Sequence, residues 1–213
     1  MTDNRIDIAS VGNSKIAKYS SCNIKRSLNL AKKLSNPELI MEKDAEDYLV
    51  LAIDKHDLGD YQGSIDDYNQ AIKLNPNYAD AYYGRAKARH RLGDYQGSID
   101  DYNQTIKLDP NYVNAYYGRG TSRHRLGDYQ GSIDDYNQTI KLNPNYVNAY
   151  YGRGMAKYDL GDYQGSIDDC NQAIKLNPNY ADAYYYRAKA KHGLGDYQGE
   201  ADDYSTYTSY QIH

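Results

Sequence analysis

A stretch of 13 residues, LGDYQGSIDDYNQ, occurs unchanged at residues 58–70, 92–104 and 126–138. A fourth copy at 160–172 differs only at Cys170, which stands where the other copies have tyrosine, and a more divergent copy begins at Leu194. The copies recur every 34 residues and divide the chain into units 45–78, 79–112, 113–146, 147–180 and 181–213. A fixed period of this length indicates a stacked repeat architecture, because one unit alone cannot bury its apolar face.

Each unit contains two helical patterns separated by turn residues. In the second unit, Asn77 is predicted to cap a helix that runs to about Leu92. Asp94 is then predicted to cap a second helix from about Tyr95 to Leu108. The predicted packing face of this second helix consists of Tyr95, Ser98, Ile99, Tyr102, Thr105 and Ile106, which recur at helical spacing. The unit is therefore predicted to be a pair of antiparallel helices.

The pattern within a unit resembles the tetratricopeptide repeat (TPR), in particular bacterial, cyanobacterial-type arrays. The residues that carry the resemblance in the second unit are Tyr82, Ala86, Leu92-Gly93-Asp94-Tyr95, Ile99, Tyr102, Ile106 and Pro110. The resemblance covers residues 45–213. It implies an all-α fold, a right-handed superhelical α-solenoid of antiparallel helix pairs. It also implies that the first helix of each unit lines a concave groove and that the second helices form the convex back.

The charged positions depart from the family pattern. Arginine recurs where the family often has leucine (Arg85, Arg119, Arg153, Arg187), and Arg89, Arg123, Lys157 and Lys191 stand where it often has an aromatic residue. We hypothesise that these cations pair with the recurrent Asp67, Asp101, Asp135, Asp169 and Asp203. Each of these aspartates follows another aspartate, and the pairs are interpreted as a solvated convex face. The helical glycines Gly84, Gly97 and Gly118 are expected to be exposed.

One face of the first helices is predicted to bind a peptide. It carries tyrosine beside cations, two features common in protein interfaces, and Gly84, Gly118 and Gly152 are expected to leave backbone open to a ligand. The predicted groove residues are Tyr83, Lys87, His90, Arg91, Tyr117, Thr121, His124, Arg125, Tyr151, Met155, Tyr158, Tyr185, Lys189 and His192. Tyrosine is the only aromatic residue type in the chain, so packing between repeats is the alternative for the tyrosines.

The first 44 residues differ from the rest in charge. They contain eight Lys/Arg against five Asp/Glu, whereas residues 45–213 contain 17 against 24. Residues 1–22 are expected to be irregular or disordered. Residues 23–44 are predicted to form a basic helical segment that caps the array or contacts an acidic partner, with a helix from about Pro37 running into the first unit.

No catalytic, cofactor-binding or metal site is predicted. The histidines His56, His90, His124 and His192 share one slot in four units, but each lacks a second ligand at zinc distance. Cys22 and Cys170 do not have the spacing of a disulfide framework or zinc site, and Cys170 is predicted to be a small buried side chain.

We therefore expect a non-enzymatic interaction scaffold that binds a protein or peptide partner, without a cofactor. A cytoplasmic location is expected, without membrane or nucleic-acid binding, because the sequence shows no apolar spanning run and its body is acidic. Self-association into a homo-oligomer is one alternative, since near-identical units could stack end to end. A nucleic-acid-binding helical repeat that uses arginines of the first helices is the other.

Overall fold

The structure is a computed structural model that describes residues 43–211 of the chain. Within this range every regular element is an α-helix. In chain order the helices are α2 (Ala45–Asp57), α3 (Tyr61–Leu74), α4 (Ala79–Arg91), α5 (Tyr95–Leu108), α6 (Val113–Arg125), α7 (Tyr129–Leu142), α8 (Val147–Asp159), α9 (Tyr163–Leu176), α10 (Ala181–Gly193) and α11 (Tyr197–Gln211). Each repeat unit contributes one pair, so the even-numbered helices are called the first helices and the odd-numbered ones the second helices.

Backbone contacts divide the chain into residues 1–44 and 45–213. The predictions for residues 1–22 and for the basic segment 23–44 fall outside the described residues, apart from Lys43 and Asp44. These two residues are not helical, and α2 begins at Ala45. The predicted helix from Pro37 therefore does not continue unbroken into the first unit.

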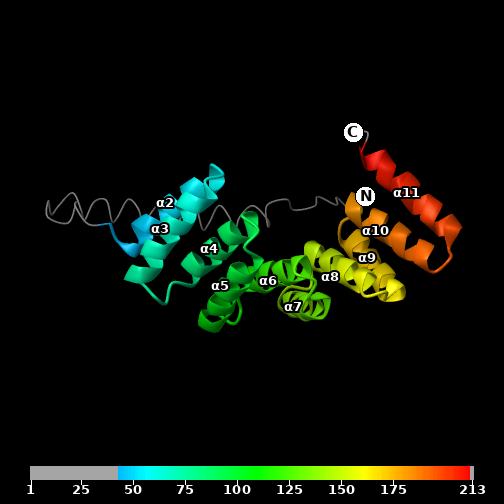
Figure 1. Cartoon of the computed structure of the whole chain (residues 1–213). Coiled ribbons are helices and arrows are strands. Elements are labelled where there is room, and N and C mark those ends of the chain that lie inside the picture. Colours follow the sequence, from blue (N-terminus) through cyan, green and yellow to red (C-terminus); the bar gives the residue numbers. More distant parts are fainter. Residues whose placement is uncertain (1–42, 212–213) are drawn as a thin grey trace, which may run out of the picture. The chain divides into compact units, whose positions relative to one another are not determined.

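The helices of residues 45–213 pack in chain order (Figure 1). Each first helix packs against the second helix of its own unit, and from α4 onward also against the second helix of the preceding unit. Successive first helices also touch each other. Every unit is thus a packing surface for the next, which makes the described region an all-α repeat solenoid, as predicted.

The turn inside each unit has the predicted chemistry. Gly93 adopts a φ of 83°, a left-handed conformation that glycine tolerates best. The Asp94 side chain then accepts a hydrogen bond from the Gly97 amide at 2.9 Å and caps α5. Asp94 as N-cap and the helix Tyr95–Leu108 are therefore confirmed, and the other four units repeat the arrangement.

The turn between units differs from the prediction. Asn77 does not cap α4; the N-cap is Tyr78, which makes no side-chain capping bond. The Asn77 amide donates instead to the side chain of Asn75, the C-cap of α3. This side-chain turn reverses the chain within a few residues. It leaves Tyr78 free to pack against the core of the first unit.

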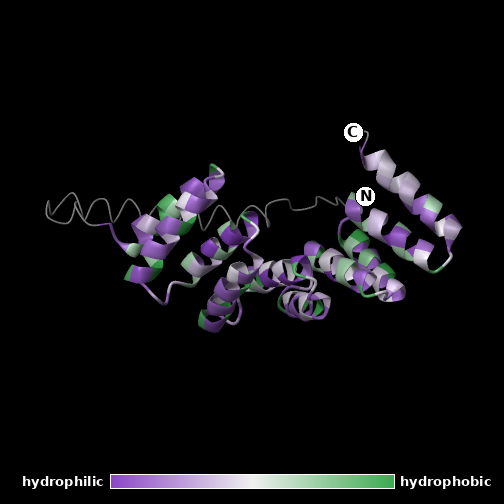
Figure 2. Cartoon of the chain, in the orientation of Figure 1, coloured by the Kyte–Doolittle hydropathy of each residue, from purple (hydrophilic) through white to green (hydrophobic). Residues whose placement is uncertain are grey.

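The core consists mainly of small side chains and one tyrosine per unit. Ser98, Ile99, Tyr102 and Thr105 of the predicted packing face are buried, and Tyr102 is only 3% exposed. The first helices contribute alanines such as Ala81 to the same core. Hydrophilic residues dominate the surface of the helices, and α11 carries little hydrophobic colour in Figure 2. The units are therefore held together by a closely packed core in which small side chains surround large tyrosine rings.

Candidate functional site

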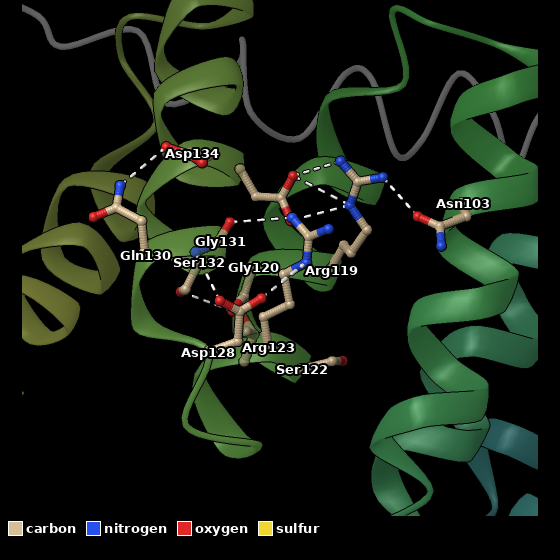
Figure 3. A network of polar contacts seen from close by, with 12 residues as sticks. Asn103, Arg119, Gly120, Ser122, Arg123, Asp128, Gln130, Gly131, Ser132 and Asp134 are labelled. Carbon is tan, nitrogen blue, oxygen red and sulfur yellow. Dashed lines mark hydrogen bonds and ion pairs between the residues drawn. The ribbon is translucent and has the colours of Figure 1, made fainter.

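Arginines form ion pairs and hydrogen bonds with a buried carboxylate of their own unit, and one arginine of each set also donates a hydrogen bond to the preceding unit (Figure 3). In the third unit, the Arg119 guanidinium lies 2.6 Å from Asp135 and donates to the Asn103 side chain of the preceding unit at 2.7 Å. Arg123 reaches the other oxygen of Asp135 at 2.9 Å. Asp135 is 2% exposed, so two cations and its burial hold one carboxylate in place.

The same arrangement recurs in most units, which confirms the proposed pairing of cations with aspartates. The equivalent contacts join Arg85 and Arg89 to Asp101, Arg153 and Lys157 to Asp169, and Arg187 and Lys191 to Asp203, with Asn69, Asn137 and Asn171 as the bridging amides. The first unit is different, because Leu51 takes the arginine slot and Lys55 alone pairs with Asp67, at 2.6 Å. Burial acts to raise the pKa of Asp203, but hydrogen bonds from Arg187 and Lys191 outweigh it and lower that pKa.

The interpretation of both aspartates as a solvated face is wrong for the second of each pair, which is buried in the second to fifth units and half-buried in the first. Asp100 is exposed, whereas Asp101 is 2% exposed. A helical step of one residue turns the second carboxylate toward the adjacent first helix. That carboxylate is therefore engaged in packing between helices and is closed to solvent.

The helical glycines are also not exposed as expected. A Cβ atom on Gly84 would lie 2.2 Å from the Tyr68 ring, and one on Gly118 would lie 2.4 Å from the Tyr102 ring. At three junctions the tyrosine of a second helix thus fills the space above the glycine of the next first helix. Gly97 instead adjoins the Asp94 cap. Gly84 is buried, and Gly97 and Gly118 are half-buried, so the predicted open backbone is largely covered.

The junction between the fourth and fifth units exchanges large and small side chains. Cys170 replaces the tyrosine, and Tyr186 stands in the slot that holds Gly84, Gly118 and Gly152 in earlier units. Tyr186 packs against the cluster that contains Cys170. Burial raises the pKa of the Cys170 thiol to about 12, and the predicted small buried side chain is confirmed. Tyr186 was not among the residues predicted from the sequence, although it differs from the glycine of its slot as plainly as Cys170 differs from tyrosine.

The predicted groove tyrosines pack mainly against other tyrosines of their own unit. The ring of Tyr83 is 4.9 Å from that of Tyr112 and 5.9 Å from that of Tyr102, and burial raises the pKa of Tyr83 to about 12. The corresponding rings of the third to fifth units have close ring partners as well: Tyr117 with Tyr146, Tyr151 with Tyr180, and Tyr185 with Tyr207. Each tyrosine is half-buried, so only part of its ring faces solvent.

The predicted histidines differ from one another in their partners. His90 contacts the Ser122 hydroxyl at 2.9 Å. His124 contacts the Asp159 carboxylate at 2.8 Å, and His192, which is exposed, contacts Glu200 at the same distance. Among residues 43–211 no group of three or more His, Cys, Asp or Glu side chains is placed to hold a metal ion.

The remaining predicted residues range from half-buried to exposed. Thr121 bonds the Tyr117 carbonyl and Met155 is half-buried, whereas Lys189 lies 4.4 Å from the centre of the Tyr158 ring. The exposed members of the predicted set are Lys87, Arg91, Arg125 and His192. These four side chains, called the exposed first-helix set, are the part of the predicted face that a partner can reach directly.

Comparison with known families agrees with the repeat geometry. A family model described as TPR repeat matches residues 54–93, 86–127 and 120–161, which together exceed half of the chain. The chain belongs to the tetratricopeptide repeat family. Two further tetratricopeptide repeat models match residues 147–180 and 170–200. The comparison with curated proteins found no match.

Several solved TPR structures share this fold. A crystal structure of MamA is 24% identical over 76% of this chain and 94% of its own, with a TM-score of 0.72. MamA from Desulfovibrio magneticus RS-1 is 19% identical over 81% and 97%, with a TM-score of 0.76. YrrB, described as a TPR protein with an unusual peptide-binding site, is 18% identical over 86% and 92%, with a TM-score of 0.70. At these identities the likeness concerns the fold.

Over residues 43–211 of this TPR chain, all helices are too short or too polar to cross a bilayer.

Proposed function

We propose that this TPR chain is a non-enzymatic interaction scaffold that binds a segment of a protein partner on the face of its first helices. The observation that carries the proposal is that the cations of the first helices fall into two sets, one buried against aspartates and one exposed. The arginines next to the second helices are bound to buried aspartates. Lys87, Arg91 and Arg125 form a second set of cations, and these are exposed. These cations lie beside half-buried tyrosines, and Tyr and Arg are the residue types that dominate interface energetics.

The relation to YrrB supports a peptide as the bound segment, since that TPR protein has a peptide-binding site. The bound segment is proposed to contact the exposed first-helix set together with the half-buried tyrosines. The cytoplasmic location stays a prediction from the sequence.

Self-association by continued stacking is disfavoured by the two ends of the array. Val50 stands in the slot where a Gly84-type residue would admit the tyrosine of a preceding unit, and Leu51 stands in the slot of Arg85. At the other end, Ser205 replaces the bridging asparagine. An end-to-end contact between two copies would therefore lack the glycine, arginine and asparagine of an interior junction. Light scattering should give a mass that does not rise with concentration.

Affinity capture with two matched baits tests the proposal. The first variant, Lys87→Ala, Arg91→Ala, Arg125→Ala and His192→Ala, removes the exposed first-helix set. The control variant, Lys73→Ala, Lys107→Ala, Lys141→Ala and Lys175→Ala, removes four exposed lysines from the second helices. A direct partner should be lost by the first variant and kept by the control, with circular dichroism showing both folded. A partner lost only by the control would move binding to the second helices.

A further inference from the structure

Two arginines stand apart from the other six of residues 43–211. Arg85, Arg89, Arg119, Arg123, Arg153 and Arg187 each form an ion pair with an aspartate. Within the described range, Arg91 and Arg125 have no carboxylate at ion-pair distance, and both are exposed. They occupy the same slot, at the last residue of α4 and of α6.

Placement at a helix end does not by itself account for these arginines. Cations in the last turn of a helix are favourable, because they face its partial negative charge. However, the same slot holds Asp57 at the end of α2, Asp159 at the end of α8 and Gly193 at the end of α10. The fold therefore forms without a cation at this position. The pair of arginines marks the second and third units as different from the rest.

The surroundings of the two arginines are electropositive. Lys87 is exposed on α4, one helical turn before Arg91. Burial lowers the pKa of His90, and the charges of Arg125 and Arg91 lower it further. Burial likewise lowers the pKa of His56, with Lys87 and Arg91 adding to the effect, although hydrogen bonding to Asp57 opposes it. His56 and His90 both lie close enough to Arg91 for its charge to lower their pKa values.

The exposed side chains Lys87, Arg91 and Arg125 are called the cationic strip. Exposed leucines border this strip, and an aspartate lies at each end. Leu92 and Leu126 directly follow the arginines in the chain and are 50% and 51% exposed. Asp57 and Asp159 occupy the arginine slot in the units on either side, and Asp159 pairs with His124. The cationic strip therefore spans two units, with carboxylates at both ends.

We infer that Arg91 and Arg125 form a two-point site for an acidic, leucine-bearing segment of a protein partner. Successive first helices touch, so the two arginine slots lie about 10 Å apart. In a peptide with the polyproline II conformation, which has three residues per turn, carboxylates three residues apart lie on the same side and are separated by about 9 Å. Each carboxylate faces one guanidinium, and the apolar side chains between them face Leu92 and Leu126. This inference rests on the proposed function and adds the chemical class of the partner.

A protein segment suits the strip better than a nucleic acid does. A nucleic acid binds through many neutralised phosphates in a row. Here the guanidinium groups number two, and the carboxylates of Asp57 and Asp159 would repel a phosphate backbone that continued past them. Charge complementarity therefore favours a short acidic segment.

Fluorescence anisotropy with the full chain tests the inference. The probe is a labelled peptide of about twelve residues in which glutamate recurs every third position between leucine and serine. Its controls are the same peptide with glutamine for glutamate and a single-stranded oligothymidylate of equal length. The Arg91→Glu, Arg125→Glu variant is compared with Lys107→Glu, Lys141→Glu, which makes the same change in net charge on exposed second-helix positions of the same two units.

We expect the arginine variant to weaken binding of the glutamate peptide by about tenfold or more, and the lysine variant by less than about twofold. The glutamine peptide should bind the unaltered chain as weakly as the glutamate peptide binds the arginine variant. Equal losses in both variants, equal binding of both peptides, or tighter binding of the oligothymidylate would each overturn the inference. The proposed function would survive such a result if the alanine bait still lost a partner that the control bait kept.

Discussion

Cys170 and Tyr186 show how a single residue depends on its partner in the next unit. At three junctions a tyrosine of the second helix lies over a glycine, and at the fourth a cysteine lies beside a tyrosine. The large side chain has moved from one side of the junction to the other. Each junction keeps one tyrosine ring, and the fourth adds only the small side chain of cysteine, so the change is close to the volume-conserving type that proteins tolerate best.

This exchange predicts the effect of restoring the common residue. Cys170→Tyr should destabilise the protein by about 1–3 kcal/mol, because Tyr186 already fills the space. The double variant Cys170→Tyr, Tyr186→Gly should regain most of that stability, since it recreates the Tyr102–Gly118 pair. Urea denaturation measures both. Additive losses in the double variant would show that the two side chains do not share one site.

The buried aspartates give a second prediction at this scale. Asp101→Asn should cost about 3 kcal/mol, because Arg85 and Arg89 then lose their shared charge in a closed site. Asp100→Asn, one residue earlier and exposed, should change stability by less than about 0.5 kcal/mol. The two variants differ only in which aspartate loses its charge, so similar denaturation midpoints would show that Arg85 and Arg89 do not depend on Asp101.

At the scale of the helix, local sequence and packing disagree at the glycines. Glycine in a helix costs about 1 kcal/mol relative to alanine, so propensity alone favours replacement. Packing opposes it, because the ring of Tyr102 occupies the place of a Cβ atom on Gly118.

Gly118→Ala should therefore destabilise α6 and its contact with α5, by about 1–3 kcal/mol. In a Tyr102→Cys background, which removes the ring, the same change should become neutral or stabilising. Thermal unfolding followed by circular dichroism compares the four proteins. A stabilising effect in both backgrounds would mean that the ring moves aside at no cost.

Much of the helical pattern could be predicted because it depends on nearby residues. The period, the Gly93-Asp94 turn and the face that includes Tyr102 all follow from spacing within a few turns. The cap of α4 was predicted wrongly, because the Asn75 side chain takes up the amide of Asn77. That competition between two asparagines in one turn depends on backbone geometry that spacing does not specify.

Contacts between helices were harder to predict. Arg85 and Arg91 look alike as helical arginines, but one binds Asp101 sixteen residues away and the other faces solvent. Only the packing of α4 against α5 separates them. For the same reason the burial of Gly84 was not predicted, since the Tyr68 ring that covers it belongs to the preceding unit.

For the whole molecule, the two kinds of junction predict which repeat can be removed. Deleting residues 113–146 would place Tyr102 over Gly152, which restores a matched junction. Deleting residues 147–180 would place Tyr136 against Tyr186, two large side chains in one space. The asparagine–arginine bridge is preserved in both cases, because Asn103 would meet Arg153 and Asn137 would meet Arg187.

Both deletions remove one unit of 34 residues, yet their stabilities should differ. The chain that lacks 147–180 should melt about 3–10 °C below the chain that lacks 113–146. Differential scanning calorimetry of the two shortened proteins measures this difference. Equal melting temperatures would show that the Cys170–Tyr186 exchange has no bearing on the order of the units.

The interior glycine–tyrosine junctions also bear on how such a gene changes in length. Near-identical coding segments recombine out of register, which adds or removes copies in whole units. Here a gain or loss among the units before the fourth leaves every junction matched, whereas the fifth unit fits only a fourth unit that carries Cys170. We therefore expect a change in copy number to be tolerated more readily before the fourth unit than between the fourth and the fifth.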